Sequence, residues 1–180
     1  MSKAIDDLKH EHDAILSALQ ILEGMGVQVA SGKDLDKKDI HNFIGFLREF
    51  ADKCHHGKEE GILFPALIKA GMPEKGGPVG VMLSEHNLGR DLIKDMEDAI
   101  SHKLNYARFA EVAKEYTNLL RAHIQKENNV LFPMAEQTLT PSQLARLYDS
   151  FEEHEEKVIG HGRHQELHVL LNDLKSRFPT

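Results

Sequence analysis

Two copies of one motif contain most of the residues that could do chemistry. The motif His-x-x-Lys-Glu-x-x-x-Leu-Phe-Pro begins at His55 and again at His123, and a Glu-His pair precedes each copy, at positions 11–12 and 85–86. A pattern that occurs twice indicates a repeated structural element. Within each copy the His and the Glu are an i, i+4 pair, so on a helix both side chains lie on one face. Imidazole and carboxylate groups in this arrangement are typical metal ligands.

The repeated side chains suit a pair of iron or manganese ions. Buried carboxylates are costly unless a cation compensates them, and a dication between them removes that cost. Structural zinc would favour thiolates, whereas imidazole with bridging carboxylates is typical of di-metal sites in helical bundles. Two six-coordinate ions have about twelve ligand positions. Two bridging carboxylates, a bridging oxo or hydroxo group and four imidazoles leave about two of them open for a small ligand.

Helical segments with regularly spaced apolar residues must position these side chains. The first covers residues 4–23, and Gly24, Gly26 and the Ser-Gly pair at 31–32 are predicted to end it and to mark a loop. The second begins after the cap residue Asp36 and continues to Pro65, which is predicted to kink or end it. The later helices repeat this organisation, because the motif occurs there a second time.

Two helix pairs follow from this pattern, at about residues 4–70 and 78–137, with a short connection at 101–105 inside the second pair. Residues 140–143, Thr-Pro-Ser-Gln, have a capping-box signature and begin a further helical segment at about 141–178, which Gly160 and Gly162 could interrupt. We therefore predict an all-α, up-down-up-down four-helix bundle with an additional C-terminal helix, in a single domain of residues 1–180.

Bulk composition argues against several classes of protein. The 180 residues carry a formal net charge of −7 without a block of Lys or Arg, so neither nucleic acid nor an anionic membrane is an expected partner. Cys54 is the only cysteine, which leaves no internal disulfide framework. We find no secretory signal at the N-terminus and no uncharged apolar run near the ~20 residues of a membrane span. We expect a cytoplasmic protein, and the sequence leaves its oligomeric state open.

The repeated motif and its Glu-His pairs resemble those of the hemerythrin family, in its bacterial and archaeal branch with HHE cation-binding domains. The resemblance covers nearly the whole chain, through Pro133 by motif. It implies a non-haem di-iron cofactor, two irons per chain, in which carboxylates and an oxo or hydroxo group bridge the irons, histidines cap them and oxygen binds at an open position. Matched position by position, the implied ligands are His12, His55, Glu59, His86, His123 and Glu127.

The sequence departs from the family's oxygen carriers at one position. Those proteins have a second histidine four residues after the one that matches His86, and this chain has Arg90 there. One terminal ligand is therefore missing or comes from elsewhere. We include His164 as the candidate metal ligand, because it shares an apolar stripe with Leu167, and nearby glycines could let its helix approach the bundle.

His56 is the alternative source of this ligand. It is adjacent to His55, but an α-helix turns neighbouring residues about 100° apart. We therefore expect His56, like Glu60, to be solvated on the polar side of its helix rather than to bind metal.

Two classes of function fit these features. The first is a non-haem di-iron protein that binds or senses a small diatomic ligand such as O2 or NO, or senses iron itself. The second is a di-iron enzyme of the oxidase or peroxidase type, or an iron donor for iron–sulfur cluster repair. The repair relatives carry an additional N-terminal domain with cysteines that we do not find here. We favour binding over catalysis, and a zinc hydrolase is disfavoured because the sequence lacks His-Glu-x-x-His.

Overall fold

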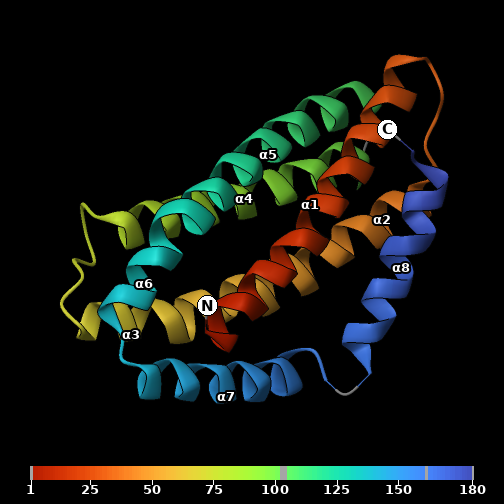
Figure 1. The fold of residues 1–180 in the computed structure, drawn as a ribbon. Coiled ribbons are helices and arrows are strands. Elements are labelled where there is room, and N and C mark those ends of the chain that lie inside the picture. Colours follow the sequence, from red (N-terminus) through yellow and green to blue (C-terminus); the bar gives the residue numbers. More distant parts are fainter. Residues whose placement is uncertain (1, 102–104, 161, 180) are drawn as a thin grey trace.

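The computed structural model describes residues 2–101, 105–160 and 162–179, and helices are the only regular secondary structure within these ranges. Four helical rods form the bundle, and a helical C-terminal segment packs on its side (Figure 1). The prediction of an all-α four-helix bundle is confirmed. The first rod is α1 (Lys3–Ala30), and the third is α4 (Pro78–Ser101). The second rod consists of α2 (Lys37–Phe46), the π-helical segments η1 (Leu47–His56) and η2 (Glu59–Leu63), and α3 (Phe64–Lys69). The fourth rod consists of α5 (Tyr106–Lys126), the π-helical segment η3 (Glu127–Leu131) and α6 (Phe132–Thr138). Three residues of the predicted connection at 101–105, namely 102–104, lie outside the described residues.

Helix α1 is longer than predicted, because Gly24 and Gly26 do not end it. A glycine inside a helix costs only about 1 kcal/mol, which the packing of a long amphipathic helix outweighs. Gly24 is also a position of close approach: a Cβ there would lie 2.5 Å from the carbonyl oxygen of Phe178, at the C-terminal end of the chain. The helix ends at the last of the predicted signals, beside Gly32, whose φ of 78° is in the left-handed region.

The two glycines of α1 give a matched pair of substitutions. Gly24→Ala should destabilise the protein by about 1–3 kcal/mol, because the new methyl group would meet backbone rather than a movable side chain. Gly26→Ala should stabilise it by about 0.5–1 kcal/mol, because a Cβ there has no neighbour within 4 Å and alanine favours the helix. Thermal unfolding of the two variants checks both signs, and a lower midpoint for Gly26→Ala would contradict this account.

Pro65 and Pro133 do not end their helices but follow π-turns. The amide of Phe64 bonds to the carbonyl of Glu59, and the amide of Phe132 bonds to that of Glu127, each five residues back. Proline lacks the N–H that would continue an α-helix and its ring crowds the preceding turn, so a regular α-turn is disfavoured there. Both prolines lie in the first turn of the next helix, where no N–H is needed. Each copy of the motif thus carries a wide turn at its glutamate.

The apolar core consists of two clusters with buried histidines and glutamates between them along every rod. On α1, for example, Leu8 belongs to one cluster and Ile15 to the other, and His12 lies between them in sequence. On α4 the same holds for Met82 and Leu92, with His86 between. The polar layer therefore divides the core at one level of the bundle.

The C-terminal segment forms two helices, α7 (Pro141–Val158) and α8 (Arg163–Arg177), which both contact α1 (Figure 1). The predicted capping box is present: the side chain of Thr140 accepts a hydrogen bond from the amide of Gln143. The interruption also lies where glycines allowed it, because Gly160 and Gly162 have φ angles of 87° and 81°. Helix α7 covers one apolar cluster, and α8 covers the other.

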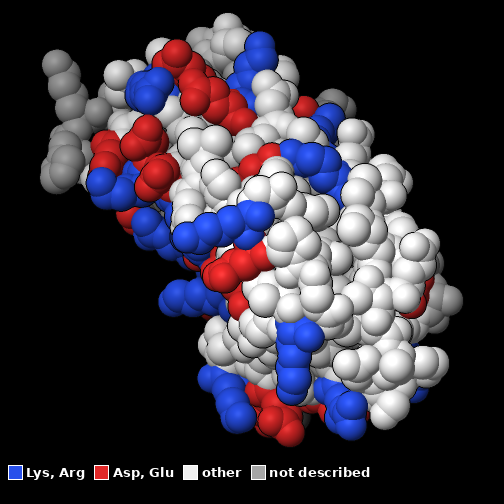
Figure 2. All heavy atoms as spheres, turned by 90° about the vertical axis from the view of Figure 1, so that its left-hand side faces the viewer, with Lys and Arg blue, Asp and Glu red and all other residues white. Residues whose placement is uncertain are grey.

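On the face shown in Figure 2, Lys and Arg lie beside Asp and Glu over the left-hand part and the lower edge, a broad area on the right consists mostly of other residues, and no continuous basic stripe is present. Among the described residues, no helix combines the length and the apolar character needed to cross a membrane.

Candidate metal centre

Six of the predicted ligands lie at one level of the bundle and are each at most 1% exposed. They come from all four rods, and the repeat places one carboxylate and one preceding histidine on each of the second and fourth rods. These six residues are His12, His55, Glu59, His86, His123 and Glu127.

The donor atoms form two clusters that share Glu59, and within each cluster the candidate ligand atoms all lie within 4.8 Å of one another. One cluster contains two carboxylates and two imidazoles, and the other contains one carboxylate and three imidazoles. Their members are His12, His55, Glu59 and Glu127 in the first cluster, and His56, Glu59, His86 and His123 in the second.

Each glutamate lies between two histidines from different rods. The distances from Nε2 to the nearer carboxylate oxygen are 3.7 Å for His55–Glu59, 3.3 Å for His86–Glu59, 3.1 Å for His12–Glu127 and 3.2 Å for His123–Glu127. The Nε2 atoms of His86 and His123 also face one another at 3.1 Å. The same nitrogen of each of these four rings therefore points into a common space.

These buried donor atoms fit a metal pair. The four carboxylate oxygens of Glu59 and Glu127, and Nε2 of His12, His55 and His56, make no hydrogen bond. Leaving so many polar atoms buried and unpaired is costly, and cations coordinated between them would remove that cost. Because imidazole nitrogen and carboxylate oxygen are the donors, iron or manganese suits the set better than structural zinc.

A second layer of side chains fixes the orientation of the rings through Nδ1. The Nδ1 hydrogen bonds are 2.9 Å to Asn128 for His12, 2.9 Å to Glu11 for His55, 2.7 Å to Glu60 for His86 and 2.9 Å to Glu85 for His123. Such partners hold the proton on Nδ1 and leave Nε2 free to bind a metal. Nδ1 of His56 lies 3.5 Å from Asp52 and makes no hydrogen bond.

The sequence did not predict a function for the glutamate of each Glu-His pair or for the repeated lysine. In the structure they form the same unit in both halves: Glu11 accepts hydrogen bonds from His55 and from Lys58, and Glu85 accepts from His123 and from Lys126. The repetition of both residue types was the available signal. The motif therefore encodes the outer layer of the site as well as the inner one.

Burial and neighbouring charges set the protonation of the site. Burial lowers the pKa of His55 and His56 well below the ordinary value, so both imidazoles are neutral, as metal ligation requires. Burial, together with the charge of Glu127, raises the pKa of Glu59 well above its ordinary value. Burial opposes the charged form of His123, but the carboxylate of Glu127, 3.2 Å from Nε2, outweighs this and raises the pKa of the ring.

The expectation that His56 is solvated is wrong. Its side chain is only 4% exposed, and its ring stacks on that of His86 with centroids 3.8 Å apart. The reason is the π-helical segment η1, which ends at His56: a π-turn contains more residues than an α-turn, so the angle between His55 and His56 is smaller than the α-helical 100°. Both neighbours therefore face the centre. Glu60 is half-buried and holds His86 rather than facing only solvent.

Arg90, which replaces the expected histidine, lies in the outer layer. Its guanidinium donates to Asp52 and to Glu60, the outer partners of His56 and His86. Position 90 therefore supplies no metal ligand itself. Arg90 instead holds the carboxylates beside His56 and His86, whose rings could bind metal.

The structure does not bring His164 to the other six predicted ligands. Its side chain is 33% exposed and packs on Phe50, and its ring lies beside that of His168 on α8. Oε1 of Glu155 lies 3.8 Å from Nδ1 of His164.

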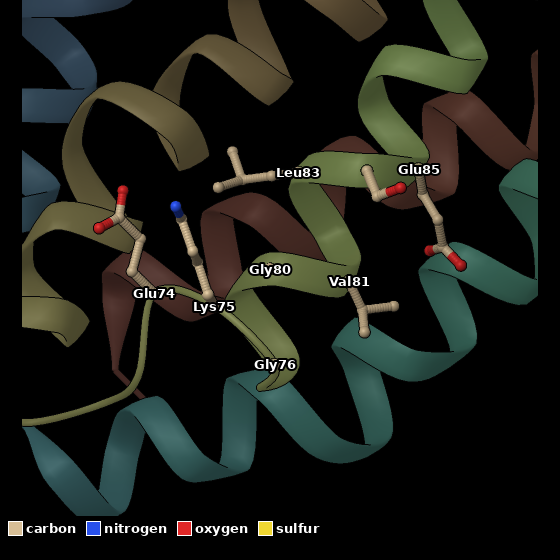
Figure 3. A pocket seen from close by; sticks show the side chains of 8 residues that line it. Glu74, Lys75, Gly76, Gly80, Val81, Leu83 and Glu85 are labelled. Atoms are coloured by element: carbon tan, nitrogen blue, oxygen red, sulfur yellow. The ribbon is translucent and has the colours of Figure 1, made fainter.

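The outer layer is more deeply buried around the first copy of the motif, at Lys58, than around the second copy, at Lys126. Lys58 is fully buried beneath α7 and pairs with Asp7, Glu11 and Glu155. In the other half, the side chain of Lys126 is 42% exposed. Glu85 borders a surface pocket of about 520 Å³ at the start of α4, and Figure 3 shows its carboxylate directed towards the neighbouring helix. Solvent therefore reaches the outer layer of the second half more easily.

A four-helix bundle with buried histidines and glutamates at one level defines a metal-binding bundle protein. The model of the family described as hemerythrin HHE cation binding domain matches residues 3–135. The chain therefore belongs to the hemerythrin HHE cation-binding family, and the resemblance inferred from the motif is confirmed.

The chain is also similar to curated proteins named iron-sulfur cluster repair protein YtfE, from Escherichia coli O1:K1 and Escherichia fergusonii. Each is 34% identical over 128 residues, which cover 64% of this chain. The match spans 56% of the length of those relatives. No solved structure matches the chain.

Proposed function

We propose that this chain is a non-haem di-iron protein whose buried centre binds a small diatomic ligand, O2 or NO. The observation that carries the proposal is the convergence of buried, unpartnered donor atoms into two clusters that share Glu59. Iron bound there supplies redox chemistry and an exchangeable coordination position. The side chains of this protein supply the donors, fix their orientation and keep bulk water out of the centre.

His56 changes the number of positions that remain for a ligand. Of about twelve positions on two six-coordinate ions, two bridging carboxylates, one bridging oxo or hydroxo group and five imidazoles would occupy about eleven. About one position is then open, instead of the two that remain with four imidazoles. The proposed ligands are His12, His55, His56, Glu59, His86, His123 and Glu127. A single open position suits end-on binding of a diatomic molecule better than chemistry that needs two adjacent positions.

A second candidate function is donation of iron to damaged iron–sulfur clusters. The observation that favours it is the similarity to proteins named for iron–sulfur cluster repair. Donation requires that iron leaves the centre, although every inner ligand is at most 4% exposed. The more exposed outer layer around Glu85 and Lys126 is the side from which such an opening would begin.

Optical spectroscopy separates the two functions. The reduced protein is exposed to O2 or NO, the gas is removed, and iron content is measured after gel filtration. A reversible absorption band with full retention of iron supports diatomic binding. Transfer of iron to a cluster-deficient iron–sulfur protein, with recovery of its cluster, supports repair. Protein that contains zinc and no iron, purified from cells grown with ample iron, would contradict the di-iron proposal.

His56→Ala tests the fifth imidazole directly. We expect the variant to lose at least about tenfold in iron affinity and to show an altered spectrum, because one imidazole donor is removed from the cluster around His86. His41→Ala is the control, since His41 is exposed on α2 and belongs to neither cluster. If His56→Ala keeps wild-type iron content and spectrum, His56 is a packing residue and the centre has four histidine ligands.

A further inference from the structure

A small pocket lies outside the central clusters, where α1, η1, α7 and α8 meet. Its volume is about 200 Å³. Its lining is dominated by imidazoles and carboxylates, the donor types of transition-metal sites. The lining residues are Asp7, His10, Glu11, Phe50, Glu152, Glu155, His164 and His168.

Two histidines on α8 form the outer wall of this pocket. His164 and His168 are an i, i+4 pair, and their ring centroids are 4.7 Å apart. Two histidines at this spacing on one helix face are the arrangement by which a helix can chelate a single metal ion. Both rings pack on Phe50, at centroid distances of 5.4 and 5.6 Å, so an apolar side chain limits their movement. His10 lines the pocket from α1.

Two carboxylates that line the pocket already pair with a cation of the protein. Glu11, Cys54 and Glu155 lie close enough to share an ion, but the ammonium of Lys58 lies 2.9 Å from Glu11 and 3.1 Å from Glu155. Any additional cation therefore has to bind at the outer, histidine end.

Carboxylates give that outer end a negative field. Glu155 directs Oε2 to Lys58 and Oε1 towards His164, 3.8 Å from Nδ1. Asp7 and Glu11 also share the single ammonium of Lys58, so the acidic groups outnumber it. A divalent cation beside the histidines would balance this excess charge.

We propose that His164, His168 and Glu155 bind one first-row divalent transition cation, such as Zn²⁺ or Fe²⁺, with His10 as a further donor from α1. The donor atoms of this set do not all lie within 4.8 Å of one another, so binding requires side-chain rotation that brings them together. Glu11 separates this site from the central clusters, because it lines the pocket and also holds Nδ1 of His55 at 2.9 Å. The two sites share no ligand. The pocket is therefore a second, mononuclear metal site on the side covered by α7 and α8.

Zinc titration tests the site in the protein as purified. Zn²⁺ is added to the wild type and to His164→Ala/His168→Ala, binding is followed by calorimetry, and the metal already bound is measured before and after. We expect the wild type to bind about one zinc in addition, and the double variant to bind it at least about tenfold more weakly with unchanged central metal.

His41→Ala is the matched control, because His41 is an exposed histidine on α2 whose Nδ1 contacts the carbonyl oxygen of Lys37 on the same helix. An unchanged zinc affinity in the double variant, or an equal loss in His41→Ala, would overturn the proposal. If the double variant does not fold, His168→Gln removes one donor while it retains a side chain against Phe50, and the same criteria apply to it.

Discussion

Replacing Glu59 with glutamine should remove metal from both halves of the centre at once. Glu59 is the one residue common to both donor clusters, and its carboxylate lies between His55 and His86. An amide cannot bridge two cations as a carboxylate does, so we expect metal content to fall at least about tenfold. Elemental analysis and the optical spectrum measure this loss. Glu60→Gln is the control, because Glu60 contacts His86 only from the outer layer, and should keep most of the metal.

In the metal-free protein, the same substitution should increase the stability of the fold. Burial and the charge of Glu127 raise the pKa of Glu59 above the ordinary value of 4.5, so the folded state binds this proton more tightly than the unfolded chain does. The free energy of unfolding of metal-free wild type therefore falls as pH rises above about 4.5 through the raised pKa. Glu59→Gln removes this contribution and should unfold at a higher temperature than metal-free wild type at neutral pH. Equal midpoints at all pH values would contradict the assignment of Glu59 as an uncompensated buried acid.

Replacing Lys58 with methionine should destabilise the protein by about 3–5 kcal/mol, because it leaves the carboxylates of Asp7, Glu11 and Glu155 without their shared cation. Although burial opposes the ammonium, the charges of Glu11 and Asp7 outweigh burial and raise the pKa of Lys58. For a chain of this length the loss corresponds to a fall of roughly 6–20 °C in the unfolding temperature.

The repeat supplies the control for this substitution. Lys126→Met changes the equivalent residue of the second half, but the side chain of Lys126 is 42% exposed and pairs with Glu85 alone. Exposed pairs contribute at most about 1 kcal/mol, so the unfolding temperature should fall by only a few degrees. Equal losses for Lys58→Met and Lys126→Met would show that burial under α7 does not distinguish the two halves.

The fold and six of the clustered donors could be predicted because they depend on repetition and periodicity. The spacing of His55 and Glu59, repeated at His123 and Glu127, specifies one helix face twice. The continuation of α1 past Gly24 could not be predicted from the sequence, because the packing of Gly24 against the C-terminal residues is a contact between distant parts of the chain.

His56 shows why the rest of the site was harder to predict. Which way it points depends on whether the backbone bonds to the fourth or the fifth preceding residue, and periodicity over a short window does not distinguish the two. The role of Arg90 depends on this as well, since its carboxylate partners are the groups that hold His56 and His86. A one-residue change in helical register thus determines the direction of the His56 side chain and the role of Arg90.

The division of the apolar core bears on how cooperatively this protein folds. Each cluster excludes water by itself, and the layer between them, at the level of His12 and Glu59, contains atoms that repel or fail to pair with one another when no cation is present. Contiguous regions of this kind can open as separate units. Ions coordinated across that layer would connect residues of all four rods. Their binding energy would then couple the unfolding of the two apolar clusters, which otherwise unfold more independently.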